Sequence, residues 1–98
     1  MKTTEEQKKL RKEINDIIYN TSLKCQTNIK DIWRICVKDM SKYCNFDLEK
    51  TYCFFMGKKK KFDILQERNL LNTFKDIVIL RCKQITIDFY RTNNYKQR

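Results

Sequence analysis

The sequence predicts an all-α fold, a small bundle of three or four helices with a long C-terminal helix. Apolar residues recur every three or four positions, Pro is absent, and Gly57 is the only glycine among the 98 residues. The tight turns of a multi-stranded sheet need Gly and Pro, so these features favour helices joined by short polar turns. A chain of this length forms at most one domain. We expect that domain to span residues 1–91, with residues 92–98 as a frayed basic tail.

A first helix is expected over about residues 4–19. Thr3 and Thr4 are each followed three positions later by a Glu or Gln, which is the spacing of a capping box. The apolar residues that follow form one stripe of the helix: Leu10, Ile14, Ile17 and Ile18. Asn20–Ser22 is a run of residues typical of turns and predicts the end of this helix.

The strongest periodicity in the chain predicts a second helix. Its apolar residues advance by threes and fours and include the single Trp: Cys25, Ile29, Ile32, Trp33, Cys36, Met40 and Tyr43. Four basic residues are spaced by four positions, close to one helical turn: Lys30, Arg34, Lys38 and Lys42. These four residues, called the basic row below, should lie along one side of the helix.

Asn45 and Asp47 are start signals for a short third helix that ends at Gly57. Its apolar stripe is Leu48, Tyr52, Phe55 and Met56. Asp63 with Gln66 predicts the start of the last helix, whose apolar positions continue to Phe89. The expected core is Ile14, Ile17, Ile32, Trp33, Leu48, Phe55, Leu71, Phe74, Val78 and Ile85. An α+β fold is the alternative, because residues near 51–65 fit a hairpin and residues near 84–90 alternate as in a half-exposed strand.

Several classes of protein are disfavoured by the composition. The chain has no His, which removes the commonest general base and the usual partner of a nucleophilic Ser or Cys. Charged residues interrupt every apolar run, so no transmembrane segment is expected, and the N-terminus has no apolar segment of a cleaved signal. We therefore expect a non-enzymatic nuclear or cytoplasmic protein that needs no cofactor.

The formal charge of +10 is spread through the folded body. Such a charge repels itself in a compact chain, and a polyanionic partner relieves that repulsion; RNA, DNA and anionic lipid all qualify. The main hypothesis is a protein that docks on RNA or DNA, for instance as an accessory subunit of a ribonucleoprotein assembly. The candidate phosphate-binding residues are the basic row and a run of four lysines: Lys30, Arg34, Lys38, Lys42, Lys58, Lys59, Lys60 and Lys61.

Aromatic residues lie between these cations in the sequence and offer surfaces on which bases stack. Phe54, Tyr90 and Tyr95 are the aromatic side chains that we expect to be exposed. Neutralising about six phosphates of duplex DNA would give a log–log salt slope of roughly −5. The lysine run also has a purely structural interpretation, because positive residues after a helix C-terminus interact favourably with the helix dipole.

Five cysteines suggest two further possibilities. Cys25, Cys36, Cys44 and Cys53 could supply four thiolates to zinc, but their intervals hold ten, seven and eight residues, unlike the tight pairs of structural zinc sites, and we expect no metal. The same four residues resemble the twin C-x9-C helical hairpin proteins of the mitochondrial intermembrane space. That resemblance implies two antiparallel helices stapled by Cys25–Cys53 and Cys36–Cys44 disulfides, with Trp33 at the docking position for the import oxidoreductase. It also implies an assembly factor or accessory subunit.

A third hypothesis is a helical protein–protein interaction module of the viral or regulatory kind. The last helix would then pair with a partner helix through Leu71, Phe74 and Val78. The sequence does not distinguish RNA from DNA or from a protein partner in a larger assembly, and it leaves the oligomeric state open.

Overall fold

The fold is all-α. The structure is a computed structural model that describes residues 4–96, with side chains as far as Asn93. Five helices follow in order: α1 (Glu5–Cys25), α2 (Ile29–Cys44), α3 (Leu48–Phe54), α4 (Lys61–Glu67) and α5 (Leu71–Lys96). The all-α prediction is confirmed, with one helix more than expected. Residues 4–96 contain no strand, so the alternative α+β fold, with a hairpin near 51–65 and a strand near 84–90, is wrong.

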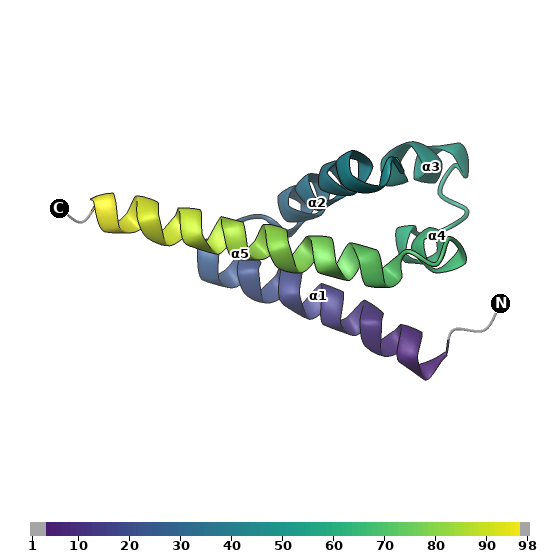
Figure 1. Cartoon of the computed structure of the whole chain (residues 1–98), viewed down its shortest axis with the longest axis horizontal. Helices are drawn as coiled ribbons and strands as arrows, with labels where there is room; N and C mark the ends of the chain where they lie inside the picture. The colour runs from purple at the N-terminus through teal and green to yellow at the C-terminus, as the bar shows by residue number, and fades with distance from the viewer. Residues whose placement is uncertain (1–3, 97–98) are drawn as a thin grey trace.

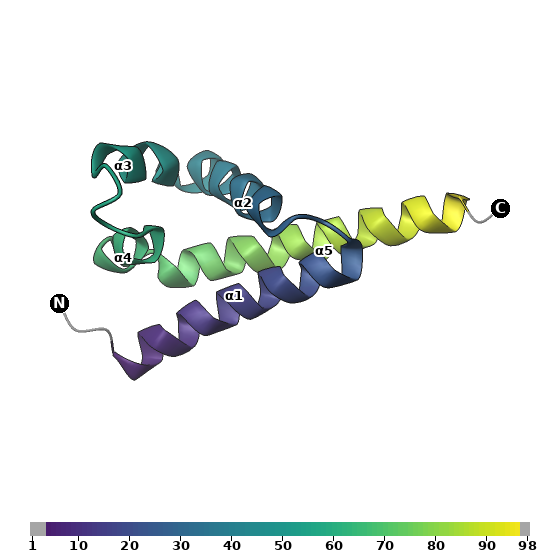
Figure 2. The same cartoon turned by 180° about the vertical axis from the view of Figure 1, so that it is seen from behind.

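Helices α1 and α5 lie side by side along the 54 Å long axis of the molecule and run in the same direction (Figures 1 and 2). Residues of the two helices that touch each other differ in number by a nearly constant amount, 62 near the start of the pair and 61 near its end. Lys75 of α5 binds Glu13 of α1, and the Cys25 thiol lies 3.7 Å from the Thr86 hydroxyl. Because α1 ends at Cys25, the ten residues of α5 after Thr86 extend beyond it.

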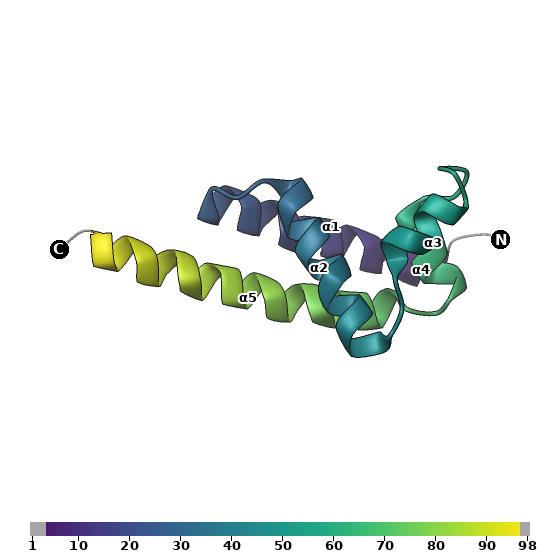
Figure 3. The same cartoon turned by 90° about the horizontal axis from the view of Figure 1, so that it is seen from above.

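Helix α2 crosses α5, and the short helices α3 and α4 pack together at the end of the molecule where α1 and α5 begin (Figure 3). Asp47 caps α3, because its side chain accepts a hydrogen bond of 2.9 Å from the Lys50 amide. Asn28 caps α2 in the same way through the Lys30 amide. The predicted start signal at Asp47 is therefore confirmed.

The hydrophobic core lies where α1, α2 and α5 meet. All five helices contribute to the ten side chains that are fully buried, and α3 contributes only Leu48. These ten are Phe74, Ile14, Ile18, Ile32, Met40, Leu48, Ile64, Leu65, Val78 and Cys36. Of the predicted core, Ile14, Ile32, Leu48, Leu71, Phe74 and Val78 are buried. The other four pack against the core while partly exposed: Ile17, Trp33, Phe55 and Ile85.

Helix α1 ends six residues later than predicted. Its capping box is the one expected at Thr4 and Gln7, with bonds of 2.9 and 3.1 Å; Thr3 lies outside the described residues. Asn20–Ser22 does not form a turn, because Thr21 lies buried on the inner face of the helix. The Ser22 hydroxyl instead donates to the Thr27 carbonyl beyond the helix end, and Gln26 takes the left-handed conformation that ends α1. Cys25 is therefore the last residue of α1 and does not belong to α2.

The predicted last helix is divided in two. Asp63 and Gln66 lie in α4, where both accept hydrogen bonds from Arg11 of α1, at 2.9 and 2.7 Å. Asn69 takes a left-handed conformation with φ +58°, and α5 begins two residues later. Asn tolerates this conformation better than most residues, which explains why the chain turns there.

Several surface predictions need correction. Ile29, Tyr43 and Met56 fit the predicted apolar stripes but are exposed. Leu71, Phe74 and Val78, the predicted face for a partner helix, are buried in the core and cannot pair with another protein.

Helix α5 continues through Thr92 to Lys96. That this tail frays stays a prediction, and residues 97–98 lie outside the described range. Within residues 4–96, no helix is sufficiently long and apolar to cross a bilayer.

Candidate nucleic-acid interface

The basic row lies exposed along α2, as the spacing predicts. Lys30, Arg34, Lys38 and Lys42 are all exposed, whereas the other side of the helix is buried through Ile32, Cys36, Val37 and Met40. Among the residues that the structure describes, Arg34 is the only member of this row that forms an ion pair, with Asp31 at 3.9 Å. Such an exposed pair is weak, so it leaves most of the positive charge of the row available.

The four lysines of the run occupy different environments. Lys58 is exposed in the turn after α3, and Lys60 is the residue that precedes α4. Lys59 pairs with Glu67 at 2.8 Å, and its ammonium lies 4.6 Å from the centre of the Phe55 ring. Lys61 pairs with Glu49 at 3.0 Å and lies over the Tyr52 ring. Two of the four lysines are thus held by contacts within the protein.

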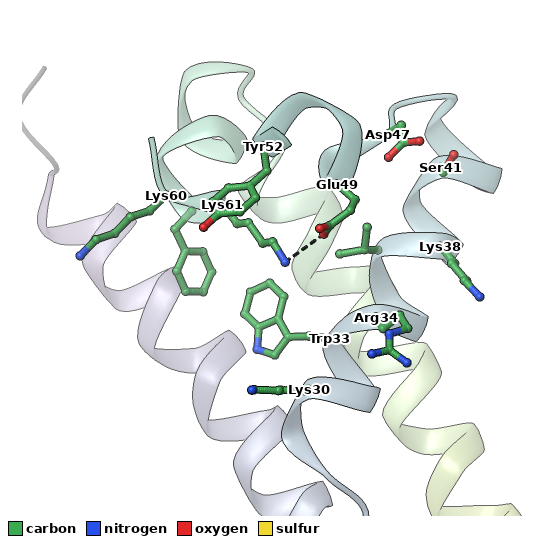
Figure 4. A pocket seen from close by; sticks show the side chains of 12 residues that line it. Lys30, Trp33, Arg34, Lys38, Ser41, Asp47, Glu49, Tyr52, Lys60 and Lys61 are labelled. Carbon is green, nitrogen blue, oxygen red and sulfur yellow. Dashed lines mark ion pairs between the residues drawn. The ribbon is translucent and has the colours of Figure 1, made fainter. Parts of the chain in front are cut away.

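A groove of about 950 Å³ brings part of the lysine run to the basic row (Figure 4). We call it the α2–α4 groove. Helix α2 forms one wall, and the start of α3, Tyr52 and the start of α4 form the other. The lining residues are Lys30, Trp33, Arg34, Val37, Lys38, Ser41, Asp47, Glu49, Tyr52, Lys60, Lys61 and Phe62.

Aromatic rings line the groove between its cations. Trp33 is half-buried and is held in place by two rings: Phe74 stacks on it at 5.2 Å between centroids, and Phe62 meets it edge-on at 5.3 Å. Tyr52 is also half-buried and lies under Lys61. Figure 4 shows Trp33 in the middle of the groove, between Lys30 and Lys61. Because these rings are already held in place, a ligand that stacks on their exposed faces causes little further loss of side-chain conformational entropy.

The charge of the groove is positive. Five cationic and two anionic side chains line it. The two carboxylates are engaged, since Asp47 caps α3 and Glu49 pairs with Lys61. Among the described residues, Lys30, Lys38 and Lys60 form no ion pair. Phosphate groups of a ligand would therefore meet three cations that no acidic side chain of this region neutralises.

The structure brings together five of the eight predicted phosphate-binding residues. Lys42, Lys58 and Lys59 do not line the groove. Sequence reasoning did not identify Ser41, Asp47 and Glu49 as part of the site. No local signal identifies them, because only the crossing of α2 and the turn into α3 place them there.

The five cysteines are free thiols, and none lines the groove. Cys36 and Cys44 both lie on α2, eight residues apart, which is roughly 12 Å along a helix. A disulfide needs Cα atoms within about 7 Å, so the implied inner bridge cannot form, and Cys25 and Cys53 lie on α1 and α3. The hairpin that the twin-cysteine resemblance implies is therefore not the fold of this chain.

A second hollow, of about 520 Å³, lies between the first turns of α1 and the start of α5. Its charged lining residues are mixed: Glu6, Lys9, Glu13 and Lys75. Glu13 and Lys75 already bind each other there, and this bond lowers the pKa of Glu13. The second hollow is therefore less suited to a polyanion than the α2–α4 groove.

Protein families, curated protein sequences and solved structures were all compared with this chain, and none matches it. Within residues 4–96, no group of three or more His, Cys, Asp or Glu side chains is placed to hold a metal ion. What the α2–α4 groove offers chemically is a set of unpaired ammonium groups around fixed aromatic rings. This combination suits a ligand that carries both phosphates and flat rings.

Proposed function

We propose that this chain is a non-enzymatic protein that binds RNA or DNA in the α2–α4 groove. The convergence of Lys30, Arg34 and Lys38 of the basic row with Lys60 and Lys61 around Trp33 carries this proposal. These cations come from segments that are separated by more than twenty residues in the sequence. The fold gathers them at one hollow, which distinguishes the site from a charged surface of ordinary composition.

The arrangement favours a single strand over a duplex. Bases in a duplex stack on each other and cannot reach an aromatic side chain, whereas unpaired bases can lie against Trp33 or Tyr52. The lysines on both walls would then contact the phosphates on either side of the inserted base. An accessory role in a ribonucleoprotein assembly is consistent with such a site.

Fluorescence anisotropy with labelled ten-nucleotide RNA and DNA, titrated at several salt concentrations, tests the proposal. If all five groove cations meet a phosphate, the log–log salt slope for a single strand should be about −3.5. Duplex DNA of the same length should bind more weakly. A slope near zero for both single strands would contradict the proposal.

Two double variants with the same net charge separate a groove site from general attraction. Lys30→Glu with Lys38→Glu reverses two groove lysines that have no ion pair. Lys12→Glu with Lys83→Glu reverses two exposed lysines outside the groove. We expect at least a tenfold larger loss of affinity in the first variant. Equal losses would show that only net charge matters.

A further inference from the structure

Two unusually exposed apolar side chains lie where α3 ends and the turn toward α4 begins. Phe54 is 79% exposed and Met56 is 84% exposed, more than any other large apolar residue among those described. They lie two positions apart, and neither lines the α2–α4 groove or the second hollow. The turn lies at the edge of the molecule, at the opposite end from the C-terminus (Figures 1 and 2).

The backbone of this turn is tightly folded. Met56 and Gly57 take consecutive left-handed conformations, with φ +55° and +80°. The Met56 amide donates to the Cys53 carbonyl, and the Lys58 amide donates to the Phe55 carbonyl, both at 3.0 Å. Phe54 also meets Phe55 edge-on at 5.4 Å, and Phe55 packs against the core. The apolar tip is therefore anchored by hydrogen bonds and by ring packing.

Lysines flank the two apolar residues. Lys50 lies one helical turn before Phe54 on α3, so the two share a face of that helix, and Lys58 follows Met56 by two positions. Both lysines are exposed, and neither forms an ion pair with a described residue. The tip, defined as Phe54, Met56, Lys50 and Lys58, thus combines apolar side chains with free positive charge.

We infer that this tip is a contact site for the surface of an anionic membrane. Apolar side chains at a protruding turn enter the boundary between headgroups and acyl chains, and neighbouring lysines bind the anionic headgroups. A projecting tip does not enclose a nucleic-acid strand, and Met56 has no flat ring for a base. Because the tip and the α2–α4 groove share no residue, this inference does not depend on the proposed function.

Sedimentation with sucrose-loaded vesicles tests the inference on the full chain. Vesicles of phosphatidylcholine with 30% phosphatidylserine should bind the protein, and vesicles of phosphatidylcholine alone should bind it at least tenfold more weakly. Phe54→Ser with Met56→Ser should lower the partition coefficient on the anionic vesicles about tenfold or more. Lys50→Glu with Lys58→Glu should lower it by a similar factor.

Matched variants decide whether the tip is responsible. Tyr43→Ser with Leu80→Ser removes two exposed apolar side chains elsewhere, and Lys30→Glu with Lys38→Glu reverses groove lysines. Both should retain most of the binding to anionic vesicles. Absence of binding by the wild-type chain would overturn the inference. So would a loss caused by the groove variant that equals or exceeds the loss caused by Phe54→Ser with Met56→Ser.

Discussion

Asp39 on α2 and Arg81 on α5 form a bidentate ion pair. The Arg81 Nε donates to one carboxylate oxygen of Asp39 at 2.6 Å, and a terminal guanidinium nitrogen donates to the other at 2.7 Å. The hydrogen bond to Asp39 raises the pKa of Arg81. Asp39 is nearly buried, although the preceding Lys38 is exposed in the groove wall. The pair therefore fixes the rotation of α2 that turns the basic row outward.

Replacing Asp39 should destabilise the fold. Asp39→Asn leaves the Arg81 guanidinium without its charged partner in a partly covered position, and we expect the free energy of unfolding to fall by about 1 to 3 kcal/mol. Urea unfolding followed by circular dichroism measures this change. The control is Asp31→Asn, which removes an exposed pair and should cost about 0.5 kcal/mol or less. Equal effects of the two variants would show that the Asp39–Arg81 pair does not hold α2.

Phe74 should be among the most important core residues. It is fully buried on α5 and stacks on Trp33, so Phe74→Ala should lower the free energy of unfolding by about 3 to 5 kcal/mol. Phe54→Ala, at a position 79% exposed, should change it by only about 0.5 kcal/mol. Urea midpoints of the two variants provide the comparison. An effect of Phe54→Ala as large as that of Phe74→Ala would contradict this ranking.

Alkaline pH should destabilise the protein partly through Cys36. Burial, with further contributions from Cys82 and Asp39, raises the pKa of the Cys36 thiol to about 12. Between about pH 9 and 12 the unfolded chain releases this proton while the folded chain retains it, so the free energy of unfolding decreases as the pH rises. Urea unfolding of wild type and Cys36→Ala at pH 8.5 and 10.5 measures the contribution. The variant should lose less stability over this interval, and identical losses would contradict the assignment.

Alkylation without reductant should find five free thiols after unfolding. In the native protein Cys53, the only exposed cysteine, should react first, and the buried Cys25, Cys36 and Cys82 should be protected. Intact mass spectrometry over a time course with iodoacetamide follows these additions. A single reactive thiol in the unfolded, unreduced chain would indicate two disulfides and a different pairing of helices from the one described.

The sequence periodicity predicts which segments are helical, because each helix buries one stripe against its neighbours. It predicts less well where a helix ends. Thr21 and Ser22 have the composition of a turn, but tertiary packing keeps them in α1, and a single left-handed residue, Asn69, separates α4 from α5. The end of α1, for example, depends on the burial of Thr21 in the packed fold.

The two halves of the candidate site differ in how far they can be predicted. The basic row follows directly from a spacing of four residues on one helix. That Lys60 and Lys61 face this row, whereas Lys58 and Lys59 do not, depends on how α2 and α4 are placed relative to each other. No pattern within a single helix contains this information, so the groove emerges only from the three-dimensional arrangement.

The fluorescence of Trp33 tests the proposed groove most directly, because the chain has no other Trp and this one lies in the middle of the groove. A single-stranded oligonucleotide is titrated into the protein while Trp33 emission and the anisotropy of a label on the oligonucleotide are recorded. A nucleic acid bound in the groove should quench Trp33 with the same midpoint as the anisotropy change, and Lys30→Glu with Lys38→Glu should weaken both signals. Binding that leaves the emission of Trp33 unchanged, or the absence of any binding at low salt, would contradict a site in the α2–α4 groove.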